Sequence, residues 1–260
     1  MRLGRLYLLV FGLLTAAPCR AAPEPPLRLC FEDVEQRPWS QPDASGLNFD
    51  LLRRVQSLLN EHFIFLAKPW KRCLSELRLG QVDGVVGAAD STDRRAFARI
   101  PQLADGREDG TRALFEDQAL VFLRVGGQGR WNGRELDSPG KVVVVQSGYL
   151  VGQQLRDKGY IPNEQVKSAA DALRMLTSGA YDVAVLQGLE ASKLAREDPR
   201  FKGRVQQAAL PYSTVSLHLM VARSIYQRDP QRIEAIWQAI GAVRQSREYR
   251  QLEAAAGVHQ

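Results

Sequence analysis

Residues 69–95 contain, in one stretch, the pattern of apolar and polar positions around which the chain is organised. Leu74 and Leu77 are three residues apart, as on one face of a helix, and Gly80 follows where a helix end favours positive φ. Residues 82–88 are a short apolar run with β-branched members, typical of a strand covered on both faces. Ligands bind beyond the carboxyl ends of such strands in open α/β sheets, so we expect residues 90–95 to lie at a binding edge.

A second copy of this pattern begins 99 residues further along the chain. Two leucines, a glycine and an aspartate keep the same spacing in both copies, at Leu74, Leu77, Gly80 and Asp83 and again at Leu173, Leu176, Gly179 and Asp182. A repeat of this length favours two similar α/β lobes over a solenoid, whose periods are shorter. The alternative is a chance match of four positions.

The remaining apolar segments extend the α/β pattern. Strands are predicted at residues 27–31, 63–67, 114–124, 141–145, 181–186 and 217–222, and helices at 49–59, 169–177 and 233–243. Residues 114–124 and 217–222 are suited to cross between lobes. We therefore predict a discontinuous first lobe, residues 22–116 and 213–260, and a second lobe, residues 117–212, inserted within it.

Three polar segments allow more than one interpretation. Residues 32–46 are predicted to be a surface loop, in which Trp39 is either a lid over a pocket or a plug in the core. Residues 126–133 are a hairpin or linker, because they lack the strand-to-helix frame and the Gly-Lys-Ser/Thr sequence of a phosphate-binding loop. Residues 146–149 either present a helix N-terminus to an anionic group or form an ordinary turn.

Residues 1–21 have the pattern of a removable signal peptide. Arg2 and Arg5 precede an apolar core, residues 6–14, that is too short to span a bilayer. A lipid anchor at Cys19 is the alternative, which the preceding Pro18 disfavours. No later stretch reaches the roughly 18 apolar residues of a spanning helix. We therefore expect an exported, periplasmic protein.

The net charge argues against nucleic acid as a partner. Without residues 1–21 the formal charge falls from +6 to about +3, because three arginines leave and no acidic residue does. The remaining arginines are scattered among acids, and no basic run is interleaved with aromatic residues. We therefore expect no nucleic-acid binding.

Two cysteines remain after cleavage, Cys30 at the end of the first predicted strand and Cys73 in the helix of residues 69–95. An even number of cysteines in an exported chain indicates a disulfide. Closing a loop of this size contributes roughly 4 kcal/mol in the chain-entropy model. Two buried free thiols are the alternative.

Residue types that serve enzymes and metal sites are sparse. None of the three histidines, His62, His218 and His259, has metal-ligand spacing or lies near a plausible Ser or Cys nucleophile. Carboxylates expected at strand ends, Glu32 and Asp90, have no partner whose pKa would be set apart from theirs for acid–base work. We expect no metal, no cofactor and no catalytic residue, and hence a site that binds a ligand without changing it chemically.

The chain resembles the family 3 extracellular solute-binding proteins, the type II periplasmic binding proteins of polar amino acid importers. The resemblance covers nearly all of the mature chain and rests on the order and spacing of residues 46–52 (GLNFDLL), 69–70 (PW), 80–84 (GQVDG), 92–95 (TDRR) and 141–145 (KVVVV). A subgroup with Cys in the first strand and a PWKRC sequence at the helix is also similar, which supports the disulfide. The resemblance implies an α/β fold with two lobes, each a mixed sheet flanked by helices, that close on a small solute by hinge motion.

The resemblance also implies which residues contact the ligand. Arg95 matches the arginine that clamps the ligand carboxylate, for which a planar guanidinium is suited; a surface role is the alternative. Glu32 matches the residue that meets the ligand side chain. Trp70 matches an apolar ligand contact, unless it closes the core over its helix. Trp39 and Tyr149 complete this part of the expected lining.

The departures from the family concern the ligand's positive group. Gln187 stands where the family places the acid for the ligand ammonium, and an amide cannot supply charge. Gly87, Ala88 and Asp90 replace the usual small hydroxyl residues. Either Asp90 or Glu32 takes the cation, or the ligand is not an α-amino acid.

We therefore expect a monomeric periplasmic protein that binds one small polar, carboxylate-bearing solute, such as an amino acid or an analogue, for an ABC importer. A sensor that binds a solute and feeds a membrane receptor is the first alternative. A periplasmic dehydratase acting on cyclic carboxylates is less favoured, because it requires a positioned acid in the cleft.

Overall fold

The computed structural model describes residues 24–258. The predicted signal peptide with Cys19, and the terminal His259, lie outside these residues. Among the residues that are described, no helix is both long and apolar enough to cross a membrane.

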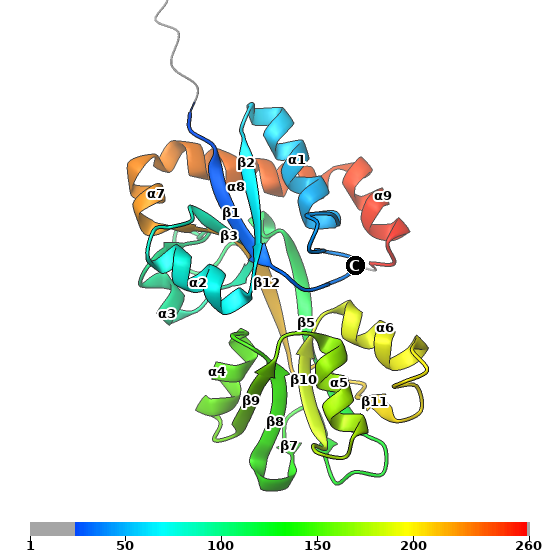
Figure 1. The fold of residues 1–260 in the computed structure, drawn as a ribbon. Helices are drawn as coiled ribbons and strands as arrows, with labels where there is room; N and C mark the ends of the chain where they lie inside the picture. The colour runs from blue at the N-terminus through cyan, green and yellow to red at the C-terminus, as the bar shows by residue number, and fades with distance from the viewer. Residues whose placement is uncertain (1–23, 259–260) are drawn as a thin grey trace, which may run out of the picture.

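Two groups of helices and strands lie one above the other in Figure 1, and two long strands run between them. These strands are β5 (Phe115–Arg124) and β12 (Ser213–Ala222). They contain nearly all of the segments predicted to cross between lobes. We propose that the lobe boundaries fall at residues 116/117 and 212/213, near the starts of the two strands.

The first lobe, the upper group in Figure 1, has parallel strands covered by helices. Its strands are β1 (Leu27–Glu32), β2 (Phe63–Lys68), β3 (Gly84–Ala89) and β4 (Ala98–Arg99). Its helices are α1 (Leu47–Leu59), α2 (Trp70–Arg78), α3 (Thr92–Arg95), α7 (Arg223–Arg228), α8 (Pro230–Gln245) and α9 (Arg247–Ala255), with the 3₁₀ turn η1 (Gly110–Arg112). Phe31, Phe49 and Trp237 belong to the apolar core under α1 and α8.

The second lobe is built around β8, whose central valines are fully buried. Its strands are β8 (Val142–Gln146), β9 (Ile161–Val166), β10 (Val183–Gln187), β11 (Val205–Gln207) and the small hairpin β6 (Arg130–Trp131) and β7 (Leu136–Asp137). Its helices are α4 (Leu150–Asp157), α5 (Ala169–Thr177) and α6 (Leu189–Glu197), with the 3₁₀ turn η2 (Pro139–Lys141). The hairpin begins inside residues 126–133, where a hairpin or linker is predicted.

The strands of both lobes form one hydrogen-bonded ladder in the order β2-β1-β3-β12-β5-β10-β8-β9. β12 pairs antiparallel with β5 through residues 213–217 and with β3 through residues 217–221, so it passes from one lobe to the other at its centre. The predicted α/β class with mixed sheets flanked by helices is confirmed. The ladder also shows that the two sheets are continuous through β5 and β12.

The repeated sequence pattern builds the same unit in each lobe. α2 leads to Gly80 with φ 69°, and α5 leads to Gly179 with φ 82°, a conformation that glycine adopts without strain. Asp83 then binds the guanidinium of Arg28 on β1, and Asp182 binds that of Arg124 on β5. Each aspartate thus fastens the start of a buried strand to its neighbour in the sheet.

The predicted disulfide between Cys30 and Cys73 is confirmed. Both residues are fully buried. The bond joins β1 to α2, so it fixes the strand that ends at Glu32 to the helix that begins at Trp70.

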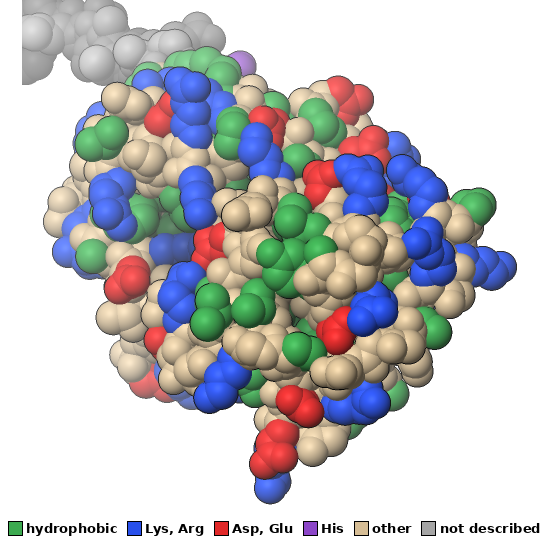
Figure 2. Space-filling model, turned by 60° about the horizontal axis from the view of Figure 1, so that its bottom comes forward, with side chains coloured by type: hydrophobic (Ala, Val, Ile, Leu, Met, Phe, Trp, Pro, Cys, Tyr) green, Lys and Arg blue, Asp and Glu red, His purple; other side chains and the backbone are tan. Residues whose placement is uncertain are grey.

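Basic and acidic side chains are interspersed on the face of the molecule shown in Figure 2. Lys and Arg side chains do not gather there into one continuous patch. This face therefore offers no stripe of positive charge that would follow a nucleic-acid backbone.

Candidate functional site

Two spaces lie between the lobes and share Arg94, Tyr149 and Leu150 in their linings. The inner cavity has a volume of about 20 Å³ and the outer groove about 740 Å³. The inner cavity has room for about one water molecule. A solute of several heavy atoms therefore needs the lobes to separate before it can enter. The side chains that give this cavity its chemistry come from both lobes: Glu32, Gln36, Trp70, Arg94, Tyr149 and Gln187.

Arg94 is the cation of the inner cavity. It lies in the short helix α3, which Ser91 caps by accepting the Arg94 backbone N–H at 3.3 Å. Its guanidinium donates to the Ala89 carbonyl at 2.8 Å and, across the interface, to the Gly148 carbonyl at 3.1 Å. The residue is 8% exposed, and burial lowers its pKa to about 10.

No carboxylate among residues 24–258 forms an ion pair with Arg94. The guanidinium also lies 5.7 Å from the centroid of the Trp70 ring, a contact with the π-face that does not neutralise its charge. The charge of Asp90 favours the charged form of Arg94, but Asp90 is paired with Arg95. A buried guanidinium without an ion-pair partner of its own is costly, and a ligand carboxylate would reduce that cost. Arg94 is therefore equipped to bind an anion.

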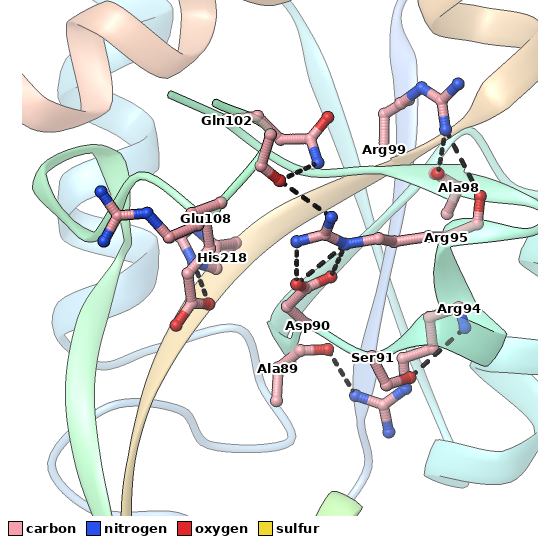
Figure 3. Close-up of polar contacts among 12 residues, drawn as sticks. Ala89, Asp90, Ser91, Arg94, Arg95, Ala98, Arg99, Gln102, Glu108 and His218 are labelled. Atoms are coloured by element: carbon pink, nitrogen blue, oxygen red, sulfur yellow. Dashed lines mark hydrogen bonds and ion pairs between the residues drawn. The ribbon is translucent and has the colours of Figure 1, made fainter. Parts of the chain in front are cut away.

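The neighbouring Arg95 does not line the inner cavity, and in Figure 3 its guanidinium lies against Asp90, apart from that of Arg94. Its Nε donates to both oxygens of Asp90 at 2.8 and 2.9 Å, and its Nη1 donates to the Gly106 carbonyl at 2.9 Å. Its side chain is 36% exposed. The structure thus places the expected clamp, Arg95, in an ion pair outside the inner cavity. Asp90 lines the outer groove and is neutralised by the same pair.

Glu32 is a buried carboxyl at the end of β1 and is 6% exposed. Its Oε2 accepts hydrogen bonds from the Tyr149 hydroxyl and the Gln36 amide, both at 2.5 Å, whereas its Oε1 is buried without a partner. Burial raises the pKa of Glu32 to about 8, and the nearby Asp33 adds to the shift. Burial also raises the pKa of the Tyr149 hydroxyl, and the charge of Glu32 raises it further. At neutral pH this carboxyl holds a proton that a ligand cation would displace.

The two tryptophans of interest have different environments. Trp70 lines the inner cavity beside Arg94, as the resemblance implies. Trp39 is 3% exposed and stacks on Phe115 with ring centroids 4.1 Å apart. Trp39 thus packs in the core, as the plug alternative has it, and does not line the inner cavity, but it does line a small cavity that adjoins it.

Gln187 ends β10 and reaches the inner cavity from the second lobe. Its backbone N–H donates to the side chain of Gln146, at the end of neighbouring β8, at 3.0 Å. β8 and β10 therefore each end in a glutamine, of which Gln187 lines the inner cavity.

The two lobes touch directly beside the inner cavity. Gly148, with φ 82°, lies so close to α2 that a Cβ atom there would stand 2.9 Å from the side chain of Lys71. Lys71 also forms an ion pair with Glu164 of the second lobe at 3.0 Å. These contacts and the Arg94–Gly148 bond hold the lobes together and would open with the cleft.

Groups suited to binding a metal ion are not assembled in the described part of the chain. No group of three or more His, Cys, Asp or Glu side chains there is arranged to hold a metal ion. His218 is fully buried on β12, with Nε2 3.4 Å from Glu108 (Figure 3). His218 does not line the inner cavity.

Three residues of the site, Arg94, Gln36 and Gly148, are not among those that the sequence indicates. Arg94 was adjacent to the chosen arginine, and Gln36 lies in a polar loop whose path has no periodic signal. The signal for Gly148 was its place after the valine strand, at the start of a helix. Glu32, Trp70, Tyr149 and Gln187, which were selected, all line the inner cavity.

No protein-family model matches the sequence. No curated protein matches it either. Solved structures do match the fold. A histidine kinase sensor domain, described as similar to periplasmic binding proteins, aligns with a TM-score of 0.68 and 17% identity over 88% of this chain and 95% of that chain.

Two ligand-binding structures match in the same way. The GluR0 ligand-binding core from Nostoc punctiforme, in complex with L-glutamate, has a TM-score of 0.71 and 17% identity over 90% of this chain and 100% of that chain. A mutant of ArgBP from T. maritima has a TM-score of 0.69 and 17% identity over 89% of this chain and 95% of that chain. At these identities the likeness shows the fold, which is that of the periplasmic binding proteins.

Proposed function

We propose that the protein is a periplasmic solute-binding protein that captures a small, carboxylate-bearing solute between its lobes and delivers it to an ABC importer. The observation that carries the proposal is Arg94, a buried guanidinium at the inter-lobe cavity with no carboxylate partner in the described chain. We assign binding of the ligand carboxylate to Arg94 in place of Arg95, because the guanidinium of Arg95 is already paired with Asp90. The similar structures that bind amino acids support a binding role.

The proposed ligand is an amino acid or an analogue of similar size. Its carboxylate would lie against Arg94, its apolar part against Trp70, and a positive group near Glu32. A planar guanidinium gives such a carboxylate two parallel hydrogen bonds, which fixes its orientation. Because nothing in this arrangement activates a nucleophile or a water, we propose binding without chemical change.

The test is calorimetric titration of the oxidised protein with a panel of small carboxylates and their amides. We expect binding that requires the carboxylate. Arg94→Gln should weaken it about a hundredfold, roughly 3 kcal/mol, because the ligand carboxylate loses its buried partner. Arg95→Gln is the matched control and should change the affinity less than threefold. Equal losses in both variants, or equal binding of acids and amides, would contradict the proposal.

A sensory role is the second candidate, since a histidine kinase sensor domain shares the fold. The two roles predict different phenotypes once the ligand is known. Deleting the gene for an importer component abolishes growth on low concentrations of the ligand as nitrogen source. Deleting the gene for a sensor component leaves uptake of labelled ligand intact and removes a transcriptional response.

A further inference from the structure

A rear cavity of about 10 Å³ adjoins the inner cavity, and Gln36, Tyr149 and Gln187 line both. Its distinctive residue is Asp117, which lies on the crossing strand β5 where the lobes meet. Glu190, at the start of α6, also lines it, and its Oε2 is buried without a partner. The rear cavity therefore has acidic walls beside the proposed ligand site.

The only guanidinium in the lining of this cavity is Arg37, among the residues that the structure describes, and it pairs with Glu35 at 3.2 Å. Asp117 itself takes part in no ion pair within residues 24–258. It accepts hydrogen bonds from the Gln118 backbone and the Gln187 side chain, neither of which carries charge. Burial raises the pKa of Asp117 to about 7, since no cation stabilises the carboxylate.

Tyr149 lines both the inner cavity, with Glu32, and the rear cavity, with Asp117. The charges of both acids raise the pKa of its hydroxyl, so both lie near it. The Glu32 Oε1, buried without a partner in a residue more than nine-tenths buried, belongs to the inner cavity on the other side. A cationic group that displaced the Gln36 amide, which lines both cavities and bonds Glu32, would bring a counter-charge to these acids.

Arg94 and Asp117 do not line the same cavity. Arg94 lines the inner cavity and outer groove, whereas Asp117 lies beyond the Gln36, Tyr149 and Gln187 side chains. In an α-amino acid the carboxylate and the ammonium are attached to one carbon, which suits partners within one cavity. A solute with its charges at opposite ends of a short chain is better suited to partners in two adjoining cavities.

We infer that Asp117 receives a cationic group of the bound solute, and that this group lies further from the carboxylate than the ammonium of an α-amino acid does. The inference rests on the proposed function, because it takes Arg94 as the carboxylate site. Asp117, on strand β5, would supply the negative charge that the uncharged Gln187 amide at the end of β10 cannot.

The test is calorimetry of the oxidised full chain with three probes, glycine, 4-aminobutyrate and butyrate. We expect 4-aminobutyrate to bind at least tenfold more tightly than either other probe. Asp117→Asn should lower its affinity at least tenfold, and Asp117→Glu should restore part of it. Glu116→Gln is the matched control, an exposed acid on the same strand outside both cavities, and should change the affinity less than twofold.

The comparison of the three probes on the unchanged protein keeps the inference testable if Asp117→Asn does not fold. Glycine binding as tightly as 4-aminobutyrate, or Asp117→Asn leaving 4-aminobutyrate binding within twofold, would overturn it. If binding depends on Arg94 but is equal for butyrate and 4-aminobutyrate, the inference fails and the proposed function stands. If carboxylates and their amides bind equally, the proposed function fails as well.

Discussion

The two copies of the helix–glycine–aspartate–strand unit are alike up to the end of the strand and differ after it. Both turn at a glycine with positive φ, and both fasten the strand through an aspartate paired with an arginine. After β3, the first unit continues through Ser91 into the short helix α3, which directs Arg94 into the cavity. After β10, the second unit passes through Gly188 directly into α6.

The part that the two units share builds the lobes, and the part in which they differ builds the site. The repeated leucines, glycine and aspartate serve in packing, turning and pairing, and none of them lines the inner cavity. The residues that follow the strands carry the chemistry, with a guanidinium from the first lobe and an amide from the second. A scaffold can therefore be duplicated while the charge of its two binding edges diverges.

The largest expected effect concerns a feature of the first unit that the second lacks, the disulfide between α2 and β1. Replacing Cys30 and Cys73 by alanine should lower the free energy of unfolding by about 4 kcal/mol, because the unfolded chain regains the freedom of a long closed loop. Urea denaturation of the variant and the oxidised wild type measures it. A loss below about 1 kcal/mol would show that the first unit does not depend on this bond.

The next effect concerns Glu32, the acid at the end of β1, in contrast to Gln146 and Gln187 at the ends of β8 and β10. The pKa of Glu32 is raised to about 8 in the folded protein, so the folded state holds a proton that the unfolded chain has released. This contribution to stability is present below the unfolded-state pKa and is lost as pH rises toward 8. We expect a loss on the order of 3 kcal/mol, read as a falling melting temperature between pH 5 and pH 8.

Glu32→Gln is the control for this pH dependence. It keeps the shape of the side chain and removes the titration, so its melting temperature should fall less steeply with pH than that of the wild type. Part of the slope should remain, because the pKa of Asp117 is raised to about 7 by the same cause. Superimposable curves would contradict the assignment of a protonated, buried Glu32.

The smallest effect tests whether the two aspartates are equivalent. Burial opposes ionisation of both, yet hydrogen bonds from the backbone and the paired arginine lower the pKa of Asp83 and of Asp182. Asp83→Asn and Asp182→Asn should each cost about 1 kcal/mol, because the arginines of both pairs are partly exposed to water. Chemical denaturation of the two variants measures this. If the losses of unfolding free energy in the two variants differ by more than about 2 kcal/mol, the two aspartates do not have equivalent structural roles.

Most of the fold could be predicted because its central elements have strong patterns. The valine run of β8, the amphipathic α1 and α8, and the repeated unit all lie where their spacing indicates. The sequence did not indicate β9, whose residues are mostly partly exposed and include a proline, or α6 and α9, whose surfaces are largely polar. Elements at the edge of a sheet or on its outside bury little, so they need less apolar periodicity.

The candidate site could be predicted as a set of strand ends more readily than as particular side chains. The carboxyl ends of parallel strands place Glu32 at the binding edge of the first lobe, and Tyr149 and Gln187 at that of the second, as their positions in the sequence already indicate. The choice between Arg94 and Arg95 was beyond the sequence, because successive residues of a helix point about 100° apart. Which one faces the cavity depends on how Ser91 starts α3 and on Asp90, which binds Arg95.

The central claim is that Arg94, at the exit of the first unit, is the residue that holds the solute. Native mass spectrometry of gently purified, oxidised protein tests it most directly, on the wild type, Arg94→Gln and Arg95→Gln. We predict that the wild type and Arg95→Gln carry the same small carboxylate, released on mild activation, and that Arg94→Gln is recovered without it. Retention of that ligand by Arg94→Gln together with its loss from Arg95→Gln would contradict the account.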